Sequence, residues 1–304
     1  MKLIVCDPTS ARAIEQMRQG GVEVDVKDTV TPEELLEVIP AYDAMVVRSR
    51  TKVTAAVIDA GVSGNLKLII RAGVGVDNID VAHAKSKGVE VRNTPASPSN
   101  SVAELTIGYL LALARQIPQA TASMKAGQWE KKAFSKCGEV SGKTLGLVGY
   151  GMIGKLVADK AHALGMEVLA CDPYVTQYPE YVQAANLDDL CSRADYVSLH
   201  VPHTPETHYI IGTKQLEMMK KGVYIVNCGR GGTLDEAALA EAIASGKVAG
   251  AALDVFEDEK VERGQRLMQL PQVIGTPHVG SGTVEAEARV GGEVAQIAID
   301  FSRR

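Results

Sequence analysis

Short runs of β-branched and other apolar residues alternate with longer amphipathic segments along almost the whole chain. Runs of this kind, bounded by Gly, Asp, Asn or Pro, are typical of strands, and the segments between them are typical of helices. Strands that are apolar at nearly every position indicate parallel sheets covered on both faces. The sequence therefore predicts an α/β protein with two doubly wound parallel-sheet domains, whose strands form a first series at 2–7, 22–26, 44–49, 66–73 and 89–94 and a second at 144–150, 167–172, 196–201, 223–229, 248–255 and 273–278.

Capping residues predict the starts of two helices. Thr31 is followed by Pro and two Glu residues, so we expect Thr31 at the N-cap and Glu34 at the third helical position. Ser101 has Glu104 three residues later, which predicts a second capping box at the start of a helix that runs to Arg115. That helix is apolar nearly all round, which indicates burial on several sides, either in a core or in a subunit interface.

The composition is that of a globular protein, because 46% of the 304 residues are apolar and 23% are charged. At about 150 residues per domain, this length predicts about two domains, and the apolar content excludes wholesale disorder. Lys and Arg number 32 and Asp and Glu 37, and the resulting net charge of −5 argues against a general nucleic-acid binder.

The chain is expected to be cytoplasmic and to make no contact with a membrane. Met1 leads directly into the first predicted strand, without the apolar region of a signal peptide. The longest apolar stretch, residues 105–114, is too short to span a bilayer. The five cysteines form neither an even disulfide framework nor a CxxC pair, which indicates reduced thiols.

Gly149, Gly151 and Gly154 form a GxGxxG motif between a predicted strand and a predicted helix. The first glycine would permit a tight turn, the second a close approach of the backbone to a diphosphate, and the third the packing of the helix on the strand. The diphosphate would lie at the positive end of the helix dipole. Asp172 ends the next strand, 18 residues beyond Gly154, where its carboxylate would accept hydrogen bonds from both ribose hydroxyls and repel a 2′-phosphate. Since no cation occupies the two following positions, the predicted cofactor is NAD and not NADP.

Three polar side chains beyond the ends of the second-series strands have the chemistry to oxidise a secondary alcohol. His278 follows the last strand and suits a general acid/base, because imidazole exchanges protons near neutral pH. Glu259 would hydrogen-bond the imidazole and fix its tautomer, although it also lies in an acidic run that is typical of a surface. Arg230 would hold a substrate carboxylate with its bidentate fork. We expect the three to meet in the crevice beyond the carboxyl ends of a parallel sheet.

Two other chemistries receive little support from the residues. His200, His203 and His208 share no established spacing with a carboxylate, so no metal site is predicted. Cys228 would lie beside the expected crevice, but the sequence places no histidine to activate it. Packing against the nicotinamide is therefore favoured over a nucleophilic role.

Several separated motifs resemble the D-isomer-specific 2-hydroxyacid dehydrogenases over essentially the whole chain, among them NTPASPSNSVAELTIGYLLALARQIP, GYGMIG, VPHTPET, NCGRGGTLDEAAL, AALDVFEDE and TPHVGSGT. The resemblance implies NAD as the cofactor and Arg230, Glu259 and His278 as the catalytic residues, in agreement with the choice made above. It also implies cofactor contacts from Gly149, Gly151, Met152, Ile153, Gly154, Asp172, Val201, Pro202, Thr207, Cys228, Arg230, Asp254 and His278.

The family's architecture is a Rossmann-type NAD domain inserted into a flavodoxin-like substrate domain. Carried over to this chain, the resemblance implies a substrate-binding domain of residues 1–95 and 281–304 and an NAD-binding domain of residues 96–280. The two crossings would act as hinges, whose closure would exclude water before hydride transfer. A homodimer is implied as well, with the predicted helix that ends at Arg115 and the polar segment 116–142 in its interface.

Within the family, the motifs most resemble the phosphoglycerate dehydrogenases, which implies oxidation of D-3-phosphoglycerate to 3-phosphohydroxypyruvate, the first step of serine biosynthesis. Arg48 and Arg71, at strand ends of the first series, would hold the phosphate, although such residues also form ordinary surface ion pairs. Lys131 of a neighbouring subunit would add a third charge, at a position where Arg is usual, so the bidentate fork is lost there. The substrate carboxylate, opposite Arg230, would be bound by the backbone amides of Ala72, Gly73 and Val74.

Two alternative functions stay open. The first is a glyoxylate/hydroxypyruvate reductase or another D-2-hydroxyacid dehydrogenase, which would need no phosphate site. The second, less favoured, is an NAD-sensing scaffold similar to the family's corepressor relatives. The catalytic trio argues against a scaffold, although those relatives keep a similar trio.

Overall fold

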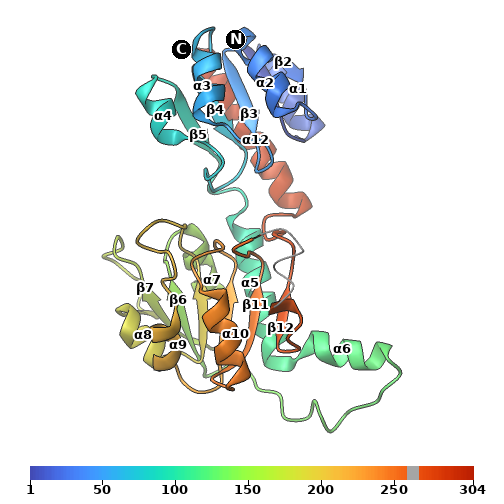
Figure 1. Cartoon of the computed structure of the whole chain (residues 1–304), viewed down its shortest axis with the longest axis vertical. Coiled ribbons are helices and arrows are strands. Elements are labelled where there is room, and N and C mark those ends of the chain that lie inside the picture. Colours follow the sequence, from blue (N-terminus) through green and yellow to red (C-terminus); the bar gives the residue numbers. More distant parts are fainter. Residues whose placement is uncertain (259–266) are drawn as a thin grey trace. The chain divides into compact units, whose positions relative to one another are not determined.

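The computed structural model describes residues 1–258 and 267–304, and the chain divides into two compact units (Figure 1). Unit 1 contains Met1–Ser99 and Ser281–Arg304, and unit 2 contains Asn100–Gly280. The chain thus leaves unit 1 after Ser99 and returns to it after Gly280. The predicted crossings follow residues 95 and 280.

Unit 1 is built on a five-stranded sheet in which every pairing is parallel. The strand order is β2-β1-β3-β4-β5, the doubly wound order of flavodoxin-like domains. The strands are β1 (Lys2–Val5), β2 (Glu23–Val26), β3 (Ala44–Val47), β4 (Leu68–Arg71) and β5 (Glu90–Asn93). The helices are α1 (Ala11–Gln19), α2 (Pro32–Val38), the 3₁₀ helix η1 (Ile39–Ala41), α3 (Ala55–Val62), α4 (Val81–Ser86) and, from the C-terminal segment, α12 (Val284–Ser302).

Alternate residues of the central strands enter two separate cores, one on each face of the sheet. Leu3 and Val5 of β1 pack with Val294 of α12, whereas Ile4 packs with Leu35 of α2. Side chains on successive strand residues point to opposite faces, so a strand buried on both faces must be apolar at every position. The apolar run at the start of the chain therefore specifies a central strand. The C-terminal helix α12 packs beside α1 and completes the cover of one face (Figure 1).

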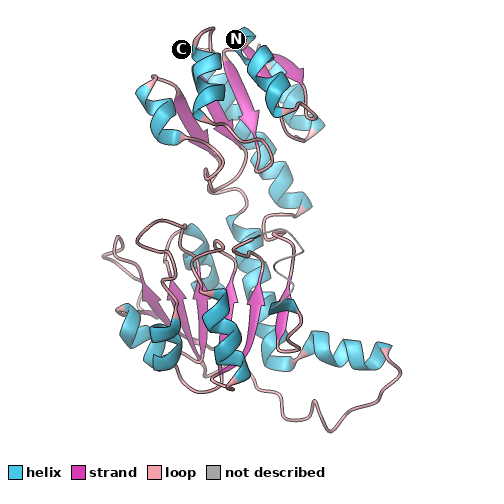
Figure 2. Ribbon diagram, viewed as in Figure 1, coloured by secondary structure: helices cyan, strands magenta, loops and turns pink. Residues whose placement is uncertain are grey.

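Unit 2 contains a seven-stranded sheet, also parallel throughout (Figure 2). Its order, β12-β11-β10-β9-β6-β7-β8, is the Rossmann order with one further strand at the β12 edge. The strands are β6 (Thr144–Val148), β7 (Glu167–Cys171), β8 (Val182–Ala184), β9 (Tyr196–Leu199), β10 (Val223–Asn227), β11 (Val248–Leu253) and β12 (Val273–Gly275). The helices are α5 (Ser99–Arg115), which starts at the crossing, α6 (Ile117–Lys125), α7 (Met152–Ala163), α8 (Leu187–Arg193), α9 (Thr213–Met218) and α10 (Glu236–Ala244).

The predicted fold class is confirmed, and two details of the sequence analysis need correction. The short edge strand β8 was not predicted, because its sequence, VQA, has no apolar run. The apolar helix α5 begins at Ser99, and Ser101 lies inside its first turn and not at an N-cap. The Glu104 carboxylate accepts a hydrogen bond from the Asn100 side-chain amide at 2.7 Å. The hydroxyl of Ser99 donates to Pro95 O at 2.7 Å, which ties the start of the helix to the preceding proline segment.

Within residues 1–258 and 267–304, no helix has both the length and the apolarity needed to cross a bilayer. All five cysteines are free thiols, and Cys6, Cys191 and Cys228 are buried. Burial raises the pKa of each of these three thiols to about 12, so they stay protonated.

The start of α2 offers a test of local stability. Thr31 Oγ1 accepts from Glu34 N at 3.2 Å, and the Glu34 carboxylate accepts from Thr31 N at 2.9 Å, which completes the predicted capping box. Thr54 stands at the N-cap of α3 in the same unit, but its side chain makes no capping hydrogen bond. We therefore expect Thr31→Ala to lower the free energy of unfolding of unit 1 by about 1 kcal/mol and Thr54→Ala to lower it by clearly less. Urea denaturation checks both, and equal losses would contradict the capping assignment.

Candidate functional site

The parallel register of unit 2 brings the ends of six strands into one row. Pairings between neighbouring strands connect, in sheet order, Cys171, Val148, Leu199, Asn227, Leu253 and Gly275. Within three residues of these strand ends follow the cofactor and catalytic residues predicted from the sequence, namely Asp172, Gly149, Val201, Pro202, Cys228, Arg230, Asp254 and His278. The sheet thus gathers at one edge residues that are separated by more than 100 positions in the chain. This edge lies at the carboxyl ends of the strands, where open α/β sheets bind ligands.

The three glycines of the GxGxxG turn each meet a different steric condition. Gly149 has φ +96°, and a Cβ there would lie 2.8 Å from the His200 carbonyl. A Cβ on Gly154 would lie 2.4 Å from Gly149 O, so this glycine lets α7 pack against the turn. Gly151 is the N-cap of α7, and a Cβ there would meet no atom within 4 Å. Open space at the start of a helix is what a diphosphate needs in order to approach the backbone, so the turn fits a dinucleotide. Met152 and Ile153 form the first turn of α7 directly behind it.

Asp172 lies at the end of β7 with its carboxylate held by two backbone amides. Oδ2 accepts from Tyr150 N at 2.8 Å, and Oδ1 accepts from Tyr174 N at 3.0 Å. These bonds fix the carboxylate next to the glycine turn. Since a carboxylate has about four acceptor positions, each oxygen retains one for a ribose hydroxyl. The arrangement suits the predicted role of Asp172 in NAD binding.

The loop after β9 is closed by its own side chains. Thr207 Oγ1 donates to Pro202 O at 2.6 Å and accepts from Thr204 N at 2.8 Å. Val201 lies against the glycine turn, since its Cγ1 is 2.9 Å from where a Gly149 Cβ would stand. Cys228, after β10, is buried as a protonated thiol, which agrees with a packing role and not with a nucleophilic one.

Arg230 and His278 follow two strands of the same row. The backbone oxygen of Arg230 accepts from Asn227 Nδ2 at 3.0 Å and from Thr233 Oγ1 at 2.7 Å, and its Nη1 donates to Gly229 O at 2.7 Å.

His278 has the left-handed backbone angle φ +54°. Its N–H donates to Asp254 O at 2.9 Å, and the residue is exposed. Glu259, the third predicted catalytic residue, lies outside the described residues.

Asp254 is almost fully buried, with 2% of its surface exposed. Its carboxylate accepts hydrogen bonds from Thr276 Oγ1, Val279 N and Gly280 N at 2.5, 2.8 and 2.8 Å. The resemblance predicts a cofactor contact for this residue. In the structure, the carboxylate binds the turn that carries His278.

The three histidines considered as metal ligands have other partners. His200 is half-buried, its Nε2 lies 2.9 Å from Ser198 Oγ, and burial of the ring lowers its pKa to about 4, so the ring is neutral. His203 Nε2 lies 3.0 Å from His208 Nδ1, and His208 stacks on Tyr209. Among the described residues, no group of three or more His, Cys, Asp or Glu side chains is arranged to hold a metal ion.

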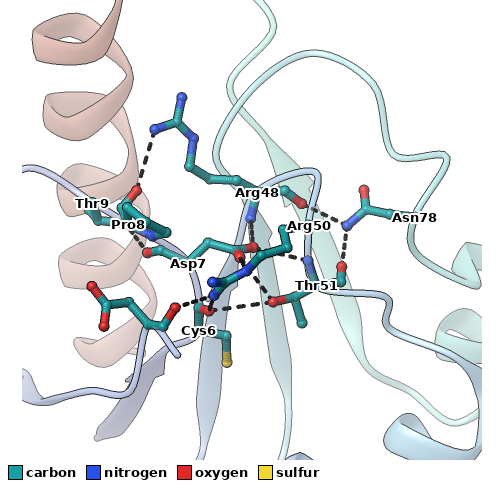
Figure 3. Close-up of polar contacts among 9 residues, drawn as sticks. Cys6, Asp7, Pro8, Thr9, Arg48, Arg50, Thr51 and Asn78 are labelled. Carbon is teal, nitrogen blue, oxygen red and sulfur yellow. Dashed lines mark hydrogen bonds and ion pairs between the residues drawn. The ribbon is translucent and has the colours of Figure 1, made fainter. Parts of the chain in front are cut away.

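Unit 1 has its own cluster of polar side chains at the carboxyl ends of β1 and β3 (Figure 3). Asp7 is buried, and its carboxylate accepts from Arg48 N at 2.5 Å, Thr51 N at 3.3 Å and Arg50 Nε at 2.9 Å. Asn78 Nδ2 donates to Arg48 O at 2.7 Å and to Thr51 O at 2.6 Å. The peptide groups on both sides of Arg48 are therefore fixed.

The two arginines of this loop have different partners. The Arg50 guanidinium forms an ion pair with Asp7 and donates to the carbonyl oxygens of Cys6 and Asp28. The Arg48 guanidinium donates to one carbonyl, that of Pro8, at 3.3 Å. Arg50 is thus bound into the fold, whereas Arg48 has most of its five donors available for a ligand.

Arg71, predicted to accompany Arg48, is the last residue of β4. Its Nη1 donates to Ala72 O at 3.1 Å, and a Cβ on Gly73 would lie 1.5 Å from that nitrogen. Gly73 has φ +141°, a backbone conformation that favours glycine. Asn93 Nδ2 holds the next carbonyl, that of Val74, at 2.5 Å. Lys131 lies in unit 2, exposed in the loop that follows α6.

Asp7 and Asn78 were not identified from the sequence. Asp7 lies two residues beyond the end of β1, and Asp172 and Asp254 directly follow their strands, so the position of a polar residue near a strand end would have marked it. Asn78 lies in a loop between β4 and α4, and its bonds to Arg48 and Thr51 join positions that are 30 and 27 residues apart. The residues around Asn78 show no pattern from which these bonds could have been predicted.

The family model described as "D-isomer specific 2-hydroxyacid dehydrogenase, NAD binding domain" matches residues 107–280, nearly all of unit 2. The chain belongs to the D-isomer specific 2-hydroxyacid dehydrogenase family. The predicted resemblance and the predicted cofactor, NAD, are both confirmed by this match.

Individual relatives carry different activities. The chain is 50% identical over 300 residues to a D-3-phosphoglycerate dehydrogenase of Methanocaldococcus jannaschii, covering 97% of this chain but only 56% of that protein. It is 48% identical over 295 residues to a hydroxypyruvate reductase of Thermotoga maritima, covering 96% of this chain and 95% of that protein. A D-lactate dehydrogenase of Aquifex aeolicus, solved with NAD and lactic acid, superimposes with a TM-score of 0.86 at 29% identity, covering 100% of this chain and 97% of that one.

Two glycine substitutions separate cofactor binding from folding. Gly151→Ala adds a methyl group to open space at the N-cap of α7, so we expect a melting temperature lowered only slightly, by the weaker cap, and a Kd for NADH raised by about tenfold or more. Gly154→Ala forces a methyl group against Gly149 O, so we expect a clearly lower melting temperature. Thermal unfolding and NADH fluorescence titration measure both. Normal NADH affinity in Gly151→Ala would show that the diphosphate lies elsewhere.

Proposed function

We propose that this chain catalyses the NAD-dependent oxidation of D-3-phosphoglycerate to 3-phosphohydroxypyruvate, the first step of serine biosynthesis. The observation that carries the proposal is the pair of arginines at the strand ends of unit 1, one of which, Arg48, presents its guanidinium from a fixed backbone. The 50% identity to a phosphoglycerate dehydrogenase over 97% of the chain supports the same substrate.

In the proposed reaction, His278 removes the proton from the substrate hydroxyl while the carbon that bears it loses a hydride. NAD⁺, when bound at the glycine turn and Asp172, would supply the acceptor for that hydride. Arg230 holds the substrate carboxylate and polarises the developing carbonyl, a task that suits its planar fork of donors. Glu259 would orient the imidazole. In the reverse direction His278 returns the proton, so one residue serves as base and as acid.

The proposed phosphate site consists of Arg48 and Arg71, with Lys131 as a third charge from a second subunit. Arginine suits this role because its fork matches the geometry of phosphate oxygens. The substrate carboxylate would be bound by the backbone amides of Ala72, Gly73 and Val74.

A second candidate function is the reduction of hydroxypyruvate, which differs from 3-phosphohydroxypyruvate by the phosphate alone. The specific observation in its favour is the Thermotoga maritima hydroxypyruvate reductase, since the chain covers 95% of that relative but only 56% of the phosphoglycerate dehydrogenase. Both candidates use the same proton and hydride chemistry.

We further propose a homodimer and a cytoplasmic location. Ile117, Met124 and Trp129, on α6 and the loop after it, expose large apolar side chains. An apolar surface of this kind favours a protein partner, and a second copy of the chain is the one expected from the sequence. Sedimentation equilibrium would test the assembly.

A substrate panel tests the proposed function. With NAD⁺ or NADH, the protein should turn over phosphoglycerate and phosphohydroxypyruvate with a higher kcat/KM than glycerate and hydroxypyruvate. His278→Ala should lower kcat on every active substrate by a factor of about 100 or more while NADH binding stays close to normal, because it removes only the proton acceptor. No turnover of any 2-hydroxy or 2-oxo acid would favour the scaffold, and a preference for hydroxypyruvate would favour the reductase.

Substitution of Arg48 tests the phosphate site. Arg48→Gln should raise KM for phosphoglycerate by about tenfold or more and KM for hydroxypyruvate by less than about threefold, because only the first substrate carries a phosphate. Arg12→Gln, at an exposed position of α1 in the same unit, is the matched control for loss of one positive charge. If KM rises equally for both substrates, Arg48 does not recognise the phosphate.

A further inference from the structure

We infer that Tyr109 and Thr276 are positioning residues for His278 and act on it through the buried carboxylate of Asp254. The inference rests on the proposed function, because it assigns these residues to the proton-transfer step proposed above. The residues involved come from three parts of unit 2, namely helix α5, the end of β11 and the turn after β12.

A continuous line of hydrogen bonds joins α5 to this turn. The Tyr109 hydroxyl lies 2.6 Å from Thr276 Oγ1 and 3.3 Å from Leu253 O. Thr276 Oγ1 lies 2.5 Å from Asp254 Oδ1. Tyr109 is 6% exposed and Asp254 is 2% exposed, so the line is shielded from water over most of its length.

Each hydrogen bond between the side chains of this line has one possible donor. The Thr276 hydroxyl donates its single hydrogen to Asp254 Oδ1. The same hydroxyl can then only accept from Tyr109, whose phenol is the donor. Burial raises the pKa of Tyr109, which keeps the phenol protonated and able to donate at any working pH.

Asp254 connects this line of hydrogen bonds to the turn after β12. Its Oδ1 also accepts from Val279 N at 2.8 Å, and its Oδ2 accepts from Gly280 N at 2.8 Å. The two residues after His278 are thus bound to one carboxylate, while the N–H of His278 itself donates to Asp254 O. A Cβ on Gly280 would lie 2.8 Å from Oδ2, so the approach of the turn to the carboxylate requires glycine there.

His278 needs such support because its backbone is strained. With φ +54° it occupies the left-handed region, which a non-glycine residue adopts only where its surroundings enforce it. The two bonds from Asp254 to the following amides supply that enforcement. Proton transfer depends on the position of the imidazole to within a fraction of an ångström, so the line from Tyr109 acts on the chemistry without touching the substrate.

The inference is tested with hydroxyl deletions that keep side-chain shape. Thr276→Val removes the donor to Asp254, and Tyr109→Phe removes the donor to Thr276. Both should lower kcat, by roughly tenfold and by roughly threefold, with KM and NADH affinity close to normal. Thr276→Ser keeps the hydroxyl and should restore most of the lost kcat. Tyr42→Phe, which deletes a buried tyrosine–carboxylate bond to Asp25 in unit 1, is the matched control and should leave kcat unchanged.

Hydrogen exchange gives a readout that does not depend on activity. In Thr276→Val, the amides of Val279 and Gly280 should exchange faster than in the unsubstituted protein, while those of unit 1 keep their rates. If Thr276→Val keeps normal kcat and normal exchange at these amides in a protein that turns over 2-oxo acids, the inference is overturned and the proposed function stands. If the unsubstituted protein turns over no 2-oxo acid, the proposed function fails. Even then, unchanged exchange of the Val279 and Gly280 amides in Thr276→Val would refute the hydrogen-bonded support of the turn.

Discussion

The parallel pairing of strands is the constraint on which both candidate sites depend. In unit 2 the pairings at the carboxyl ends of the strands connect Cys171 of β7 to Gly275 of β12, so six strand ends form one row. Each crossover returns the chain to the amino ends of the strands before the next strand begins. The carboxyl ends of all the strands therefore lie on the same side of the sheet. Backbone hydrogen bonds, and not any attraction among the polar residues, bring Asp172, Arg230 and His278 to one edge.

Both sheets place their polar clusters where the strand order reverses. In unit 2 the glycine turn follows β6, which lies between β7 and β9, and in unit 1 Asp7 and Arg48 follow β1 and β3. Helices on opposite faces of the sheet leave a crevice at such a point. Three aspartates lie at or just beyond strand ends, namely Asp7, Asp172 and Asp254. The carboxylate of each accepts hydrogen bonds from backbone N–H groups of nearby loops.

The sequence predicts features that depend on local pattern and misses those that depend on tertiary contacts. All eleven predicted strands are present, and they could be predicted because strands buried on both faces must be apolar throughout. The strand β8 was not predicted because it is a short, polar edge strand. The glycine motif and the candidate residues just beyond the strand ends can likewise be predicted from the local sequence pattern. Tyr109, Thr276 and Asn78 are missed because their bonds join segments whose closeness no local pattern reveals, as in the 167 positions between Tyr109 and Thr276.

The loop after β3 shows how neighbouring like charges acquire different roles. Arg48 and Arg50 are two residues apart and equivalent by composition, yet Asp7 binds the side chain of Arg50 and only the backbone of Arg48. The ion pair neutralises one charge and anchors the loop, whereas the Arg48 guanidinium donates to Pro8 O and is the one proposed to bind a ligand. Relatives with 50% and 48% identity carry activities on phosphorylated and unphosphorylated substrates. In the proposed function the proton and hydride chemistry is common to both substrates, and the proposed choice between them rests on side chains such as Arg48, whose backbone the buried Asp7 carboxylate holds.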